Sequence, residues 1–190
     1  EQVEMYRKLF GLDKPIHIQY IEYWKNFFTK GTLGLSLYTG RDVAKDVAEY
    51  LPSTLELVIV AMVFSVIVGV ILGVVSAMYR NKWLDNVLRV IAIAGVSLPR
   101  YWIAILFQLA LAYYLNLLPM TGKISTHLMV ERITGFTILD CLITGNWEAF
   151  IDTLRHLILP VIALSLSPIA QIMRLVRASI LEELHKPYVS

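Results

Sequence analysis

The sequence is poor in the residues that build disulfides, metal sites and nucleic-acid surfaces. Its one cysteine, Cys141, cannot form a disulfide within the chain, and no histidine and cysteine cluster has metal-ligand spacing. The net charge is only +2, and no basic stretch is interleaved with aromatic residues in the manner that favours nucleic acid. We therefore expect no metal site, no cofactor and no nucleic-acid partner.

Catalytic signatures are also missing from the sequence. Neither a nucleophile paired with a base nor a pair of neighbouring carboxylates stands out. The phosphate-binding motif G-x-x-x-x-G-K-[ST] is absent, because Leu117 stands where the first glycine before Gly122-Lys123 would be. The sequence predicts no catalytic residue, and if ATP drives this protein, a separate subunit hydrolyses it.

Charge is missing altogether from residues 57–78, LVIVAMVFSVIVGVILGVVSAM. A helix of this length spans roughly 30 Å, the hydrocarbon thickness of a bilayer. The alternative, a core helix of a large soluble domain, would usually be shorter and keep a polar face. The chain is 57% hydrophobic with a mean hydropathy of +0.62, whereas soluble domains are roughly 45–50% apolar. The sequence therefore predicts an all-α membrane protein.

Three membrane spans are predicted, at residues 51–79, 87–118 and 156–175. The loop after the first carries Arg80, Lys82 and Arg89 against one acidic residue, so the positive-inside rule places it in the cytoplasm. A straight helix over 87–118 would be roughly 48 Å long, too long for one ordinary crossing. Since proline removes an amide donor, we expect this span to be broken or bent near Pro99.

The remaining segments are expected to lie at the membrane surfaces. Residues 1–50 are predicted to form interfacial helices at 1–10, 16–28 and 41–50 on the outer side, with a ligand site as the alternative. Pro52 is predicted to lie in the first turn of the first span. Residues 119–155 are predicted to form an outer segment. Residues 176–190 are predicted to form a cytoplasmic helix.

Polar residues and prolines inside the predicted spans are the candidates for a translocation path, because such residues are tolerated where they meet other helices or water. Arg100 is either such a residue or one that reaches the cytoplasmic interface. Gly69 and Gly73 form a small-xxx-small pair, which favours helix packing over a ligand role. The path candidates are Ser97, Pro99, Arg100, Gln108, Ser165, Ser167, Pro168 and Gln171.

Five stretches in order along the chain carry a resemblance to a known family. They are FGLDKPIHIQYIEYWKNFF with GTLGLSL, LPSTLEL, LDNVLRVIAIAGVSLPRYWIAILFQLALAYYLNLLPMTG, TGFTILDCLITGNWEAFIDTLRHLILPVIALSL and RLVRASILEELHKPYV. Together they resemble the integral membrane permease of type I ABC importers, in the oligopeptide, dipeptide and nickel branch. Thr32 stands where the family usually has aspartate, and Arg100 where it has a small or apolar residue. We expect the chain to be a fragment, since the family's first span, last spans and alanine–glycine coupling motif are not in it.

The resemblance implies a multi-pass protein in the plasma membrane of a bacterium or archaeon. Its implied partners are a second permease subunit, two ATP-binding subunits, an extracytoplasmic substrate-binding protein and the lipid bilayer. The implied function is ATP-driven import of di- or oligopeptides, with nickel or oligosaccharides as alternative cargo. An intramembrane enzyme and a structural or assembly protein are the alternatives from other classes. The residues implied to couple to the ATPase are Arg174, Arg177, Glu182, Glu183 and Tyr188.

Overall fold

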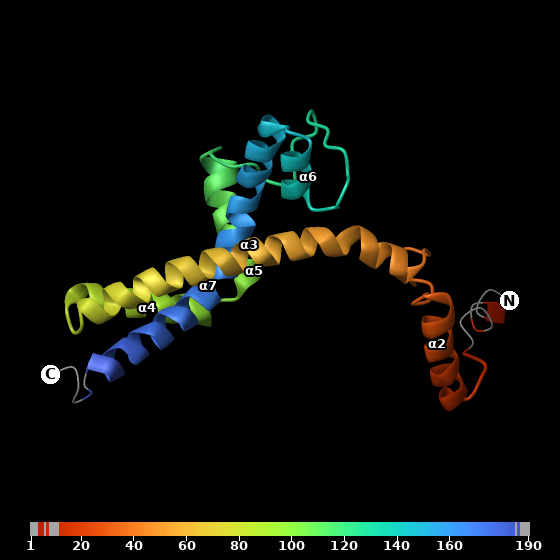
Figure 1. Cartoon of the computed structure of the whole chain (residues 1–190), viewed down its shortest axis with the longest axis horizontal. Helices are drawn as coiled ribbons and strands as arrows, with labels where there is room; N and C mark the ends of the chain where they lie inside the picture. The colour runs from red at the N-terminus through yellow and green to blue at the C-terminus, as the bar shows by residue number, and fades with distance from the viewer. Residues whose placement is uncertain (1–3, 6, 8–11, 185, 187–190) are drawn as a thin grey trace. The chain divides into compact units, whose positions relative to one another are not determined.

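The computed structural model describes residues 4–5, 7, 12–184 and 186. Within them the chain is helical, and its one sheet-like contact is an isolated antiparallel bridge between Leu35 and Asp42. The prediction of an all-α protein is confirmed, whereas the predicted helix over 1–10 falls mostly outside the described residues. The elements, coloured from red to blue in Figure 1, are α2 (Ile16–Lys30), α3 (Val43–Met78), α4 (Trp83–Ser97), α5 (Arg100–Phe107), the π-helix η1 (Gln108–Tyr114), α6 (Thr137–Ile143) and α7 (Trp147–Leu184).

Helix α3 begins earlier than the sequence suggests. A helix over 41–50 and a separate span opening at residue 51 were expected, but α3 runs through both and contains Pro52 in its interior. Its start is set by Asp42, whose carboxylate accepts a hydrogen bond from the backbone N–H of Ala44 at 2.8 Å. The placement of Pro52 in the first turn was therefore wrong. The chain divides into two compact units, residues 1–52 and 53–190, and each is described by itself.

Among the described residues, two helices, α3 and α7, are each long and apolar enough to cross a membrane, and α4 with α5 and η1 makes a third if that bent pair is one span. The two parts of the pair meet at an angle of 107°, which confirms the break predicted near Pro99. The cause is local, because proline disfavours helical backbone in the residue before it. Leu98 is extended there, with φ −82° and ψ 139°.

Helix α7 joins three regions that the sequence divided. It covers the end of the predicted outer segment, the predicted span 156–175 and most of the predicted cytoplasmic helix. The 38-residue stretch contains no glycine, so Pro160 and Pro168 are its only strong helix breakers. These prolines bend α7 rather than end it, and its upper and lower halves run in different directions in Figure 1.

The unit of residues 53–190 is assembled around α7, against which α4, α5 and α6 pack. Its buried apolar centre consists of Ala92, Ala170 and Met173, with Leu72 and Leu88 packed against it. Large apolar side chains cover the rest of α3, where Val63, Ile67 and Ile71 are all more than half exposed. Such a surface suits lipid or further membrane helices rather than water.

Candidate functional site

The most completely built polar site joins α3, α4 and α7. Asp85, in the first turn of α4, is fully buried. Its carboxylate accepts hydrogen bonds from Arg177 Nε at 2.9 Å and Nη2 at 2.8 Å, in a two-point pairing. It also accepts from Ser76 Oγ at 2.6 Å and from the backbone N–H of Asn81 at 3.1 Å. Arg89 lies farther off, with Nε 3.7 Å from the carboxylate.

The chemistry of this site is that of a charge held in place, not of a reacting group. A buried carboxylate is tolerated only when opposite charge and hydrogen bonds compensate it, and Asp85 has both. The sequence singled out Arg177 but treated Asp85 only as one charge of the cytoplasmic loop. The two residues are 92 positions apart, so no local pattern could have paired them.

Close helix packing continues from this site along α3 and α7. A Cβ atom added to Gly73 would lie 2.7 Å from Cβ of Val176, and one added to Gly69 would lie 2.8 Å from Cβ of Ile172. Both distances are shorter than real carbon contacts, so only glycine permits this approach of the two helices. The structure thus places both predicted packing glycines against α7.

The predicted path residues fall into separate places. Arg100 and Pro168 line one cavity of about 130 Å³ together with Ser65 and the apolar residues Val58, Ala61, Met62 and Leu164. Ser165 is fully buried and donates to the backbone carbonyl of Ala61 on α3 at 3.1 Å. It therefore ties α7 to α3.

Other path candidates lie away from the Arg100 cavity. Gln171 donates to Ser167 Oγ at 3.2 Å, one turn earlier on α7. Ser97 and Pro99 are exposed at the break between α4 and α5. Gln108 opens the π-helix η1 and donates to the carbonyl of Met120 at 2.7 Å.

Gln108 lines a second cavity, of about 190 Å³, that the sequence did not predict. His156 of α7 forms part of its wall, with its Nδ1 2.9 Å from the carbonyl of Asp152. π-helical turns are rare and frequently lie at functional sites, so the position of η1 beside this cavity favours a functional role for the cavity. The full lining is Ala104, Gln108, Pro119, Met120, Thr121, Gly122, His156, Leu159 and Pro160.

Three carboxylates that the sequence did not single out hold the segment between η1 and α7. Glu56 of α3 accepts from the backbone N–H groups of Thr137 and Ile138, at the start of α6. Asp152 of α7 accepts from Ser125 N at 2.7 Å and from its Oγ at 2.8 Å. A carboxylate that accepts backbone N–H groups fixes the course of an irregular loop.

Asp140 is the third of these carboxylates. It accepts from Thr134 N at 2.7 Å, Thr134 Oγ1 at 2.6 Å and Gly135 N at 3.1 Å. Burial by itself would raise the pKa of Asp140, but these hydrogen bonds outweigh it and the pKa lies below its usual value. The loop before α6 is therefore held by an ionised carboxylate.

Three of the other predicted coupling residues, Arg174, Glu182 and Glu183, lie in the C-terminal part of α7. Arg174 is exposed, as are Glu182 and Glu183, and Glu183 forms an ion pair with Lys186. Tyr188 lies outside the described residues. Among the residues that the structure describes, no group of three or more histidine, cysteine, aspartate or glutamate side chains could hold a metal ion.

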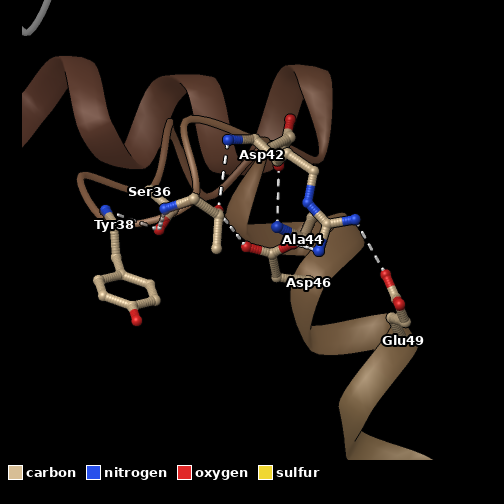
Figure 2. Close-up of polar contacts among 8 residues, drawn as sticks. Ser36, Tyr38, Asp42, Ala44, Asp46 and Glu49 are labelled. Atoms are coloured by element: carbon tan, nitrogen blue, oxygen red, sulfur yellow. Dashed lines mark hydrogen bonds and ion pairs between the residues drawn. The ribbon is translucent and has the colours of Figure 1, made fainter.

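A second polar cluster lies in the unit of residues 1–52, at the turn before α3 (Figure 2). Thr32 Oγ1 donates to Asp42 at 2.8 Å, and this bond with the Ala44 N–H keeps the pKa of Asp42 below its usual value. Arg41 pairs with Asp46 at 2.8 Å and with Glu49 at 3.1 Å. These contacts are local, so the cluster stabilises the turn and the start of α3.

Residues 69–190 match the family described as "binding-protein-dependent transport system inner membrane component". The chain is 37% identical over 188 residues to a probable D,D-dipeptide transport system permease protein of Escherichia coli K12, covering 98% of the chain and 55% of that protein. It is 39% identical over 179 residues to a dipeptide transport system permease protein of Alkalihalophilus pseudofirmus, covering 94% and 54%. A third relative, 36% identical over 170 residues and covering 88% and 53%, is a putrescine export system permease protein of Escherichia coli K12. The chain thus spans about half the length of the curated relatives it matches.

Proposed function

Since the chain belongs to the family of binding-protein-dependent transport system inner membrane components, we propose that it works as the permease subunit of an ATP-driven importer of di- and oligopeptides. The observation that carries this proposal is the similarity to dipeptide permeases along nearly the whole chain. The apolar α3 and α7 and the bent α4–η1 pair agree with a multi-pass membrane protein.

The proposed machine has further subunits. A second permease pairs with this one, two ATP-binding subunits hydrolyse ATP, and an extracytoplasmic binding protein delivers the cargo. The absence of a phosphate-binding motif from this sequence supports a separate ATPase. The exposed apolar side chains of α3 supply a surface suited to a neighbouring permease or to lipid.

The proposed orientation follows from charge. The loop between α3 and α4 carries Arg80 and Lys82 and is assigned to the cytoplasm. The C-terminal part of α7, with Arg174, Glu182 and Glu183, is then on the ATPase side. The segment from η1 to α6 faces the binding protein.

The proposed translocation path runs past two cavities. We assign to it the cavity beside Arg100 and Pro168 and the cavity beside Gln108 and His156. Arg100 supplies a charge at the first cavity. The free-energy cost of placing this charge within the membrane is offset if water or cargo enters the cavity. Import then requires that cargo binds the outward- and inward-facing states with different affinity.

Nickel and oligosaccharides are the alternative cargoes for the same machine. The described residues contain no cluster suited to nickel, which favours organic cargo. One relative carries the name of a putrescine export permease, so family membership by itself does not determine cargo. A structural or assembly protein is the alternative from another class.

Reconstitution tests the proposal. The full-length permease would be co-purified with its nucleotide-binding and binding-protein partners and placed in liposomes. We expect ATP-dependent uptake of a radiolabelled dipeptide, and competition by unlabelled dipeptide. High affinity of the binding protein for nickel without affinity for peptides would contradict the assignment of peptides as cargo. Failure of the permease to associate with any ATPase would contradict its assignment to an ATP-driven importer.

A further inference from the structure

The polar site at Asp85 and the glycine contacts of α3 lie next to each other on both helices. Val176, which faces Gly73, is the neighbour of Arg177 in the sequence, and Ser76 follows Gly73 by three residues. An ion pair, a hydrogen bond and a close backbone approach therefore form one continuous interface between the end of α3, the start of α4 and α7.

We propose that Asp85 and Arg177 lock α3, α4 and the C-terminal part of α7 into one rigid body, which carries the movement of the ATPase side to the membrane spans. This inference rests on the proposed function, because it gives the importer a specific transmission element. Asp85 and Arg177 act in it as positioning residues.

The geometry explains why this interface moves as a unit. The two-point pairing of the Arg177 guanidinium with the Asp85 carboxylate holds one orientation, since rotation or sliding of α7 breaks both bonds at once. Asp85 is fully buried, so a shift that breaks these bonds while the site stays buried leaves its charge uncompensated. Close-packed interfaces of this kind hold discrete arrangements and do not deform gradually.

The connections of the locked body suit transmission. On one side, α7 continues from Arg177 to the exposed Glu182 and Glu183. On the other, α4 leads from Asp85 to the 107° break at Pro99 and to Arg100 at its cavity. A displacement applied to the end of α7 therefore reaches the break between α4 and α5 through Asp85.

A distance measurement on the complete importer tests the rigid body directly. Spin labels at Trp83→Cys on α4 and Ser179→Cys on α7 occupy exposed positions, while Cys141 is buried and stays unlabelled. Between the nucleotide-free and the ATP–vanadate-trapped complex, we expect the distance to change by less than about 2 Å, whereas a one-turn shift of α7 would change it by about 5 Å. A change of that larger size overturns the proposal.

Variants test the transmission role. In those complexes of Arg177→Gln and Asp85→Asn that still assemble, we expect the substrate moved per ATP hydrolysed to fall about tenfold. Arg177→Lys should retain part of the coupling, and Lys82→Gln, which removes an exposed charge from the adjacent loop, should retain all of it. An unchanged ratio of transport to hydrolysis in both Asp85→Asn and Arg177→Gln overturns the proposal.

The two readouts separate this inference from the proposed function. If the wild-type complex hydrolyses ATP but moves no peptide, the cargo assignment fails, and the spin-label distance still decides the rigid body. If the variants do not assemble, the spin-label distance in the wild-type complex alone decides whether α3, α4 and α7 form a rigid body.

Discussion

At the scale of single residues, buried carboxylates hold helices and loops of this structure in place. Asp85 and Asp140 are each at most 2% exposed, and each is compensated by several hydrogen bonds. Their surroundings differ. Asp85 pairs with an arginine 92 positions later in the sequence, whereas the hydroxyl and N–H groups that Asp140 accepts from belong to the loop just before α6.

Asp85→Asn should destabilise the protein strongly. Removing one partner of a buried ion pair typically costs about 3–5 kcal/mol, because the other charge is left uncompensated. Thermal unfolding of the purified protein in detergent would measure the loss. Glu131→Gln, which removes an exposed charge from the loop before α6, is the control and should change stability by less than about 0.5 kcal/mol. Equal effects of the two substitutions would contradict the buried pairing.

Asp140 should make the loop before α6 sensitive to acid. Its pKa is depressed in the folded protein, so its stabilising effect is complete above its unfolded value of about 4 and is lost as pH falls through the lower, folded value. Hydrogen exchange at the amides of Thr134 and Gly135 should therefore lose protection below about pH 4. In Asp140→Asn the amides should be less protected at neutral pH, and this acid step should be absent.

At the scale of the elements, α7 is the helix against which the others pack, and α3 meets it through glycines. Substitution at these contacts tests whether the approach of the two helices matters. In Gly73→Leu the added side chain meets Val176. Overpacking of this kind typically destabilises a protein by about 1–3 kcal/mol, because side chains and backbone must shift to make room. Thermal unfolding should show this loss, while Val63→Leu on the exposed side of α3 should show almost none. Tolerance of leucine at Gly73 would mean that α3 and α7 are not packed as described.

At the scale of the whole molecule, the aromatic residues of α2 indicate where that helix meets the membrane. Helix α2 groups aromatic rings around Trp24, which contacts Tyr20, Phe27 and Phe28. Amphipathic aromatic rings favour the membrane–water interface. We expect α2 to lie there.

Fluorescence in liposomes would check the position of α2. A variant of the full-length protein that keeps only Trp24, with phenylalanine at every other tryptophan, isolates the emission of Trp24. Lipids brominated near the headgroup should quench Trp24 more strongly than lipids brominated near the bilayer centre. A variant that keeps only Trp102, on α5, provides a comparison from one of the candidate spans. Equal or absent quenching of Trp24 by the two lipids would contradict an interfacial position.

The sequence by itself determined the fold class, the apolar helices and the break at Pro99, because each depends on local composition or on the backbone chemistry of one residue. It located helix ends less well: Pro52 and the region near residue 156 were expected at boundaries, yet both lie inside long helices. There the Asp42 cap and the lack of glycine in α7 outweighed the local signals.

Only the tertiary structure decided which polar residues act together. It paired Arg177 with Asp85 across 92 positions, placed Ser165 on the backbone of α3, and brought His156 beside Gln108. Such partners follow from how helices cross, which no local pattern encodes. The physical reason is that a buried charge must find its compensation in space, wherever along the chain that partner lies.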